Sequence, residues 1–173
     1  MARADLAARR LLDHFEPDQL PVDPYALAEH LDVIVVEQPM AADVSGMLIR
    51  EPDRTVIGVN QGHHKHRKRF TVAHELGHHQ LHRGRSLIMD TDVRVNFRDP
   101  VSSLATDREE IEANRFAASL LMPEHLVRRE ISQTPFDSAV HLVTRLAGQL
   151  AVSPEAMNFR LVNLGVIPTP VEL

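Results

Sequence analysis

The chain has 173 residues, 43% of them hydrophobic, which is enough for one compact core and hardly enough for two. It has no cysteine, which excludes a disulfide framework, and no amino-terminal apolar run with the length of a signal peptide or a membrane span. From these two absences we expect a cytoplasmic protein that does not enter a membrane. The formal net charge of −5 argues separately against a general attraction to nucleic acid.

Two short helices and a small sheet are predicted for the first third of the chain. An amphipathic pattern at 2–15 predicts the first helix, and Asp23 and Pro24 open a second one, because proline suits the first helical turn. Three branched, apolar runs predict strands at 33–36, 44–49 and 55–59. We expect a mostly antiparallel sheet, an exposed edge of which would suit an extended peptide that adds as a further strand.

A basic run, His-His-Lys-His-Arg-Lys-Arg, occupies residues 63–69. Runs of this kind usually form a solvated loop and the first turn of a helix, and this is the interpretation we prefer. The alternative is that the run attracts an acidic substrate segment or a phosphate.

The next five-residue pattern is HExxH, in the sequence His74-Glu75-Leu76-Gly77-His78. On a helix, histidines four positions apart lie on one face and can share a zinc ion, while Glu75 follows one step round the helix. Gly77 indicates a neighbour that packs too closely for a methyl group. The alternative is a histidine-rich surface helix without a metal. Since the pattern alone is unspecific, further ligands have to come from the rest of the chain.

A catalytic zinc site normally has three protein ligands, so a third ligand is expected elsewhere in the sequence. Residues 82–105 mix charged, turn-forming and scattered apolar residues, and predict a long irregular connection of the kind that often forms lids. Thr106 and Glu109 then have the spacing of a capping box, which predicts that a helix begins here and runs to Met122.

Glu110 is the candidate for the third ligand. Projection of the predicted helix places Glu110 in the middle of the apolar face, and Glu112 on the polar face. A buried carboxylate requires a charge partner or a metal, and Asn114, one turn later, would hold a neighbouring ligand by a hydrogen bond. The alternative is that Glu110 pairs with a buried arginine and Asn114 bonds a loop backbone. His82 lies too far along its helix to bind the same ion, and is expected to support a ligand or to lie at the surface.

The carboxy-terminal region predicts a helix, a tight turn and a second helix over residues 146–161, with Ser153 and Pro154 at the second start. This spacing resembles a helix-turn-helix unit. Its second helix offers three candidate contacts to bases or phosphates, Asn158, Arg160 and Asn163. We expect a helical pair that packs on the protein or docks a partner, and we rank direct DNA binding below that interpretation.

The HExxH pattern and the Glu110 helix belong to longer strings, which are RFTVAHELGH at 69–78, EIEANRFAA at 110–118 and LLMP at 120–123. These strings are far more specific than the five-residue pattern, and together they resemble the ImmA/IrrE metallo-endopeptidases. The resemblance is strong from residue 69 to residue 123 and weaker elsewhere, although LPVDP at 20–24 also resembles the amino-terminal region of that family.

We therefore expect an α+β fold in which residues 1–125 form a zincin-like peptidase domain, with a small, mostly antiparallel sheet packed on helices. Residues 126–173 are expected to form a helical, helix-turn-helix-like extension that packs on this domain. The resemblance implies a gluzincin-like site in which His74, His78 and Glu110 bind the metal and Glu75 is the general base.

The resemblance also implies a zinc-dependent endopeptidase with one Zn²⁺ per chain, which cleaves a helix-turn-helix transcriptional repressor. Two imidazoles and a carboxylate also suit Mn²⁺ or Fe²⁺. Tyr25, His141 and Arg115 are unranked candidates for stabilising the oxyanion. The alternative function is a DNA-binding or repressor-binding regulator whose metal site senses or stabilises and does not cleave.

Overall fold

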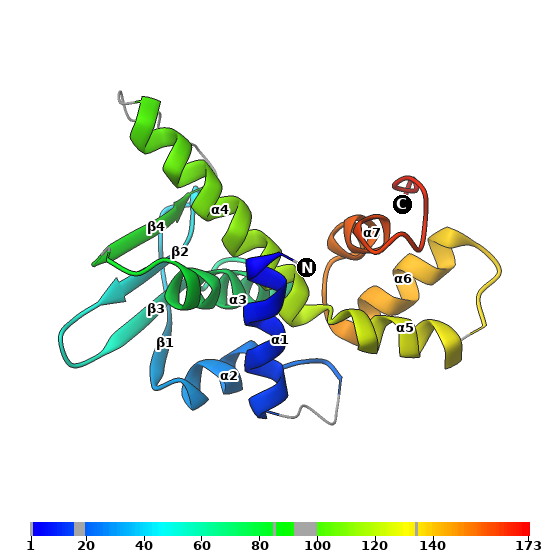
Figure 1. The fold of residues 1–173 in the computed structure, drawn as a ribbon, viewed down its shortest axis with the longest axis horizontal. Helices are drawn as coiled ribbons and strands as arrows, with labels where there is room; N and C mark the ends of the chain where they lie inside the picture. Colours follow the sequence, from blue (N-terminus) through cyan, green and yellow to red (C-terminus); the bar gives the residue numbers. More distant parts are fainter. Residues whose placement is uncertain (1, 16–19, 85, 92–99, 134) are drawn as a thin grey trace.

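The computed structural model describes residues 2–15, 20–84, 86–91, 100–133 and 135–173. These residues form helices and a four-stranded sheet, as the predicted α+β fold requires (Figure 1). The elements are α1 (Arg3–Phe15), α2 (Pro24–His30), β1 (Val33–Gln38), β2 (Val44–Arg50), β3 (Thr55–Asn60), α3 (Lys65–Leu81), β4 (Leu87–Thr91), α4 (Pro100–Leu121), α5 (Glu124–Gln133), α6 (Ala139–Leu150) and α7 (Pro154–Asn163). None of the helices in this described part of the chain combines the length and apolarity needed to cross a membrane.

The elements predicted at the amino-terminal end are confirmed. The Asp23 carboxylate accepts a hydrogen bond from the Tyr25 amide at 2.9 Å, and Pro24 occupies the first position of α2. This arrangement satisfies an amide that would otherwise lack a partner at the start of the helix. The three predicted strands all form, and each extends slightly beyond its apolar run.

Two predictions between α3 and α4 are wrong. The stretch expected to be irregular contains β4, in which Ile88 is buried while Leu87 and Met89 are exposed. Helix α4 begins at Pro100, so Thr106 lies inside the helix and is not its N-cap. Proline is well suited to that first position because its missing amide hydrogen has no helical partner there. Within the predicted connection, residue 85 and residues 92–99 lie outside the described residues.

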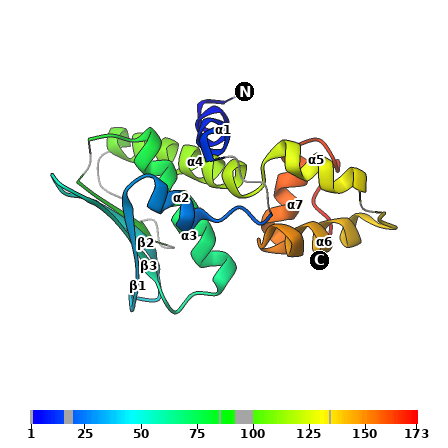
Figure 2. The ribbon, with the colours of Figure 1, turned by 90° about the horizontal axis from the view of Figure 1, so that it is seen from below.

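The sheet has the strand order β1-β3-β2-β4. Strand β2 is antiparallel to both β3 and β4, whereas β1 is parallel to β3, so the sheet is mixed and mostly antiparallel, as predicted. Helices α2 and α3 lie on one side of it (Figure 2). The edge strands are β1 and β4, an assignment that the sequence did not provide.

Helix α3 is the central element of the fold, because it contacts β2, β3, α1, α2 and α4. Residues 71–78 are all buried, which is unusual for a helix segment that contains two histidines and a glutamate. Polar side chains in such a position require compensating partners. Their burial therefore points to a site inside the protein and not to a histidine-rich surface helix.

Gly77 allows α3 and α4 to approach each other closely. A Cβ atom added at Gly77 would lie 3.1 Å from the Ala113 Cα atom and 3.2 Å from the Ala113 carbonyl oxygen. These are backbone atoms, which cannot move aside as the end of a flexible side chain can. The close packing expected from the sequence is thus present, and its partner is α4.

We expect Gly77→Ala to lower the free energy of unfolding by about 1–3 kcal/mol, the usual effect of overpacking. The matched control is Gly148→Ala in α6, where an added Cβ meets nothing within 4 Å. The control should gain up to about 1 kcal/mol from the better helix propensity of alanine. Urea unfolding of both variants measures the difference. Equal stabilisation of both variants would contradict a tight contact at Gly77.

The predicted helix, turn and helix at the carboxy-terminal end are also present. Ala151 ends α6 with a φ of 51°, and the Ser153 hydroxyl accepts a hydrogen bond from the Ala156 amide at 3.1 Å at the start of α7. In Figure 1, α5, α6 and α7 lie on the side of the molecule away from the sheet. Arg160 donates to the Met122 carbonyl at 2.9 Å, and Arg69 donates to the Ala151 carbonyl at 3.2 Å. These two bonds tie the helices to the rest of the chain.

Candidate metal centre

Two imidazole rings on α3 face each other in the interior of the protein. His74 and His78 are 2% and 1% exposed, and their Nε2 atoms lie 3.0 Å apart. One helical turn separates the two residues, which is why both rings lie on one face of α3, edge to face, with their planes inclined by 70°. The geometry that the HExxH spacing predicts is therefore present.

Helix α4 adds the Glu110 carboxylate to this pair. Its Oε2 atom lies 3.2 Å from His74 Nε2, and its Oε1 atom lies 3.2 Å from His78 Nε2. Glu110 precedes Ala113, the residue against which Gly77 packs, by about one helical turn, so the close helix contact sets the position of the carboxylate. The Glu110 side chain is 28% exposed, which leaves one side of the group accessible.

These three side chains fit a divalent metal ion. In a tetrahedral zinc site the donor atoms lie about 2.0–2.2 Å from the metal, and therefore roughly 3.3 Å from one another. The separations of 3.0 and 3.2 Å agree with that spacing. Two imidazoles and a carboxylate form a donor set used for zinc, manganese and iron alike. His74, His78 and Glu110 are thus a candidate metal-binding group.

The same three residues share protons when no metal is bound. Burial opposes a charged His74, but the contact with Glu110 prevails and raises the pKa of His74 to about 9. Burial also acts on Glu110, but its contacts with His74 and His78 hold the pKa of this carboxyl far below its usual value. Burial lowers the pKa of His78, which therefore stays neutral. At neutral pH a proton on His74 competes with a metal for this group.

We expect zinc affinity to rise about tenfold per pH unit between pH 6 and 8, since binding of each ion releases the proton from His74. The rise continues to the raised pKa of His74, about 9. Ordinary histidines would instead give an affinity that levels off above about pH 7. Competition with a chelator of known proton affinity at several pH values measures the slope. A flat profile from pH 7 to 8 would contradict the shared proton.

Glu75 lies next to this group and is fully buried, at 0% exposure. Among the described residues, neither of its carboxylate oxygens has a hydrogen-bond partner. Burial raises the pKa of Glu75 to about 8. Its Oε1 atom would lie 3.4 Å from a Cβ atom added at Gly46 in β2, so the strand backbone closes this side of the site. A buried carboxyl of this kind can take up and release a proton near neutral pH.

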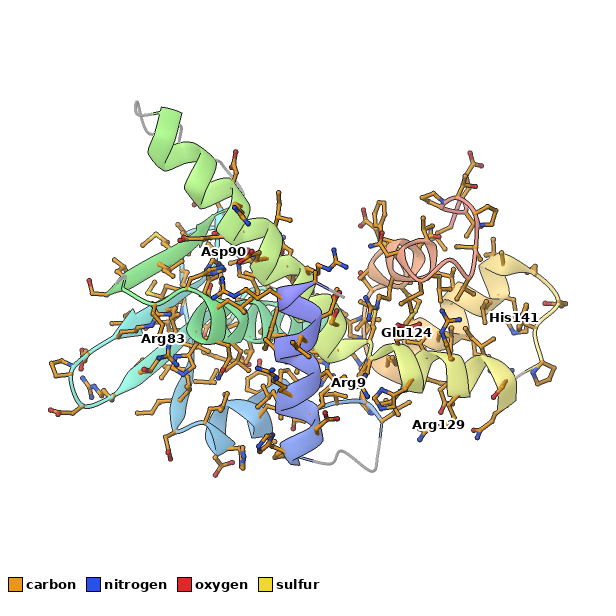
Figure 3. All side chains as sticks on the ribbon, in the orientation of Figure 1. Arg9, Arg83, Asp90, Glu124, Arg129 and His141 are labelled. Atoms are coloured by element: carbon orange, nitrogen blue, oxygen red, sulfur yellow. The ribbon has the colours of Figure 1, made fainter. Side chains whose placement is uncertain are left out.

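Asp90 is a site residue that sequence reasoning missed. It belongs to β4, the strand that was not predicted, and its carboxylate groups with His74 and Glu75, with donor atoms within 4.8 Å of one another. Figure 3 shows Asp90 where β4 lies beside α4. The edge strand β4 therefore borders the candidate metal centre.

Asn114 lies beside the group, as the sequence predicted. Its Oδ1 atom is 3.0 Å from His74 Nδ1, the ring nitrogen that points away from Glu110. On the opposite side, His82 contacts His78, and Glu112 contacts His82. Glu112, which helix projection placed on a polar face, thus joins the site through His82. No local signal in the sequence links these two residues.

The candidates for oxyanion stabilisation are each bonded to a carboxylate outside the His74, His78 and Glu110 group. Tyr25 donates to Glu37, Arg115 donates to Asp5, and the His141 ring bonds Asp137. His141 also lies on α6, at the far end of the molecule from Asp90 (Figure 3). The oxyanion role is therefore not assigned to any of the three.

The basic run at 63–69 contributes to the fold. Lys68 forms an ion pair with Glu37, and Arg67 donates to the Ser45 hydroxyl at 2.8 Å. These contacts fix the start of α3 against the sheet. The preferred interpretation of the run as a loop and first helical turn agrees with this position.

Two of the three candidate DNA contacts in α7 have internal roles. Asn158 is 5% exposed, donates to the Val171 carbonyl and accepts from the Val171 amide. Arg160 donates to the Met122 carbonyl. Of the three, only Asn163 is exposed. This distribution favours a packing role for α7 over a role in reading DNA.

Comparisons with known proteins identify a family and a shared fold for this chain. The model of the IrrE N-terminal-like domain, family Peptidase M78, matches residues 28–162. The chain is 26% identical over 121 residues to "Uncharacterized immunity region protein 2" of Bacillus phage phi105, covering 70% of this chain and 69% of that protein.

A solved structure described as a Mycobacterium tuberculosis transcriptional regulator shares the fold, with a TM-score of 0.57 and 19% sequence identity over 94% of this chain. The alignment covers 47% of that structure, so the chain spans about half its length. The family match includes the HExxH helix and the Glu110 helix, and the resemblance predicted from the sequence is confirmed. The chain belongs to the Peptidase M78 family of IrrE N-terminal-like domains, whose name implies a metallopeptidase-type hydrolase.

Proposed function

We propose that the protein is a zinc-dependent endopeptidase that hydrolyses one peptide bond in a helix-turn-helix transcriptional repressor. The observation that carries this proposal is the buried carboxylate of Glu75 beside the His74, His78 and Glu110 group. A purely structural zinc site usually closes its fourth position with another protein ligand and needs no carboxylate next to the first histidine. This arrangement supports catalysis over a sensing or stabilising role.

In this proposal His74, His78 and Glu110 hold one zinc ion. The bound ion would supply Lewis-acid activation of a water molecule and of the scissile carbonyl. Glu75 accepts a proton from the attacking water and returns it to the departing amine nitrogen as the C–N bond breaks. Burial raises the pKa of Glu75 in the metal-free protein, and the positive charge of a bound ion would favour the ionised form that accepts the proton.

We further propose that the substrate lies along β4 as an extended strand. Strand β4 is an edge of the sheet, and its Asp90 groups with His74 and Glu75. Main-chain hydrogen bonds to an edge strand give affinity without a strict sequence requirement. Of the two edge strands, β1 and β4, only β4 has a described residue, Asp90, that groups with His74 and Glu75.

The repressor as substrate rests on the family and on the phage relative, whose printed name places it in an immunity region. In the same proposal residues 1–125 carry the catalytic site, and 126–173 form an extension that helps to dock the partner. The alternative is a regulator that binds the repressor or DNA without cleavage.

The test uses the zinc-loaded protein and a helix-turn-helix repressor encoded beside its gene, followed by intact-mass analysis. The expected products are two fragments whose masses add up to that of the repressor plus one water. Removal of the metal by a chelator should stop the reaction, and added zinc should restore it. A stable complex with uncut repressor would instead support the regulatory alternative.

A further inference from the structure

The second ring nitrogen of His78 is held by a hydrogen-bond relay that consists of the His82 and Glu112 side chains. His78 Nδ1 lies 3.0 Å from His82 Nδ1, and His82 Nε2 lies 3.1 Å from Glu112 Oε2. His82 is 7% exposed although it caps the end of α3, and the contact with Glu112 spans thirty residues of sequence. The contact thus joins α3 to α4 close to His78.

Because Glu112 is at the end of this relay, its carboxylate determines which ring nitrogens of His82 and His78 carry a proton. An ionised carboxylate only accepts hydrogen bonds, so His82 must carry its proton on Nε2. A neutral His82 then has a lone pair on Nδ1, which accepts the Nδ1 proton of His78. His78 consequently has its lone pair on Nε2, the atom that faces Glu110 and His74. This is the tautomer that a metal ligand requires.

Both ends of the hydrogen-bond relay are held in place by arginine residues from other elements. Arg50 in β2 donates to the His78 and His82 carbonyls, each at 2.8 Å. Arg3 in α1 lies 3.6 Å from Glu112 Oε2 and donates to the Leu81 carbonyl at 2.8 Å. The Glu112 side chain is 23% exposed, so it is partly shielded from competing water. The positions of His82 and Glu112 are thus determined by these arginine contacts as well as by the hydrogen bonds of the relay itself.

We propose that His82 and Glu112 are positioning residues that hold His78 in its metal-binding tautomer. They do for His78 what Asn114 does for His74 on the other side of the group. Partners of this kind fix the orientation of a histidine ligand and raise its basicity. The inference rests on the proposed metal site and adds two residues to it.

The test compares His82→Phe, Glu112→Ala and Glu112→Gln with the control His79→Phe. His79 lies on α3 as well, but in the described chain it is part neither of the His74, His78 and Glu110 group nor of the His74, Glu75 and Asp90 group. Phenylalanine keeps the ring and removes the hydrogen bonds, and glutamine keeps an oxygen that accepts the His82 proton. Zinc affinity is measured by chelator competition, and histidine tautomers are measured by long-range ¹H–¹⁵N NMR of the metal-free protein.

We expect His82→Phe and Glu112→Ala to weaken zinc binding about 10–100-fold, the usual effect of losing such a partner. Glu112→Gln should lie closer to the wild type, and His79→Phe should match it. In the metal-free wild type, His78 should carry its proton on Nδ1 and His82 on Nε2. In Glu112→Ala, His78 should show a mixture of both tautomers.

Equal zinc affinity in His82→Phe, Glu112→Ala and the control would overturn the proposal, and so would a His78 proton on Nε2 in the wild type. If His82→Phe fails to fold, the pair Glu112→Ala and Glu112→Gln gives the same decision. Zinc affinity in these variants tests the positioning role alone, whereas the cleavage assay on the repressor tests the peptidase proposal. Either proposal can therefore be contradicted without the other. A wild type that binds no zinc would overturn both.

Discussion

Glu75→Gln is expected to lower the rate of peptide cleavage by about 10²–10⁴-fold, the contribution typical of a positioned general base. Glutamine has the shape of glutamate and fits the same space beside Gly46, but it cannot take a proton from water. Zinc affinity and repressor binding should stay nearly unchanged, because Glu75 is not part of the His74, His78 and Glu110 group. Cleavage rates at saturating zinc, with bound zinc measured in parallel, test this result.

The matched control is Glu124→Gln, an identical chemical change in an exposed carboxylate that pairs with Arg128 on α5. It should cleave at the wild-type rate. Cleavage by Glu75→Gln at the rate of this control would show that Glu75 is not the general base. Relief of repression that survives Glu75→Gln would favour the regulatory alternative.

The effect of Glu75→Gln on the free energy of unfolding of the metal-free protein should depend on pH. The folded-state pKa of Glu75 is raised to about 8 from 4.5, so the folded protein holds this proton more tightly than the unfolded chain. Its contribution to stability is present at low pH and is lost as the pH rises from 4.5 to 8. Glu75→Gln should therefore gain stability over the wild type across this range in urea unfolding. A constant difference would contradict a buried, unpartnered carboxylate.

Glu110→Ala is expected to weaken zinc binding by well over ~100-fold. Loss of a residue that only hydrogen-bonds to a metal ligand typically weakens it by up to ~100-fold. Two imidazoles alone leave a three-ligand site incomplete. In addition, His74 and His78 each lose their only carboxylate contact within the candidate group. Chelator competition at pH 7 measures the change.

Glu124→Ala is the control for this substitution, because it removes a surface carboxylate on α5 that pairs with Arg128. Its zinc affinity should equal that of the wild type. Glu112→Ala is unsuitable as a control, since Glu112 contacts His82. Unchanged affinity in Glu110→Ala would assign the third ligand to another residue.

The helix faces that carry the candidate metal ligands were readable from the sequence because they depend on helix periodicity. The spacing of His74 and His78 places both on one face, and the same periodicity places Glu110 toward the core. Gly77 added a third local signal, which the contact with Ala113 explains. Each of these signals is carried by a few neighbouring residues, whereas the meeting of Glu110 with the two histidines also depends on the packing of α4 against α3.

The remaining features depend on contacts between distant segments. Strand β4 has five residues, and two of its apolar side chains, Leu87 and Met89, face outward, so its pattern is too short to predict a strand. The capping pattern at Thr106 was local, but α4 continues upstream of it to Pro100. The missed roles of Asp90 and Glu112 follow from these pairings. Arg160 likewise suggested DNA binding because its partner, the Met122 carbonyl, lies 38 residues away.

X-ray absorption at the zinc edge of the zinc-loaded protein tests the candidate metal centre most directly. We expect four nitrogen or oxygen neighbours at about 2.0–2.1 Å, with multiple scattering from two imidazole rings. That result agrees with His74, His78, Glu110 and one position left for water. Three or more imidazoles, or a six-coordinate shell without imidazole, would contradict the account and place the metal elsewhere in this histidine-rich chain.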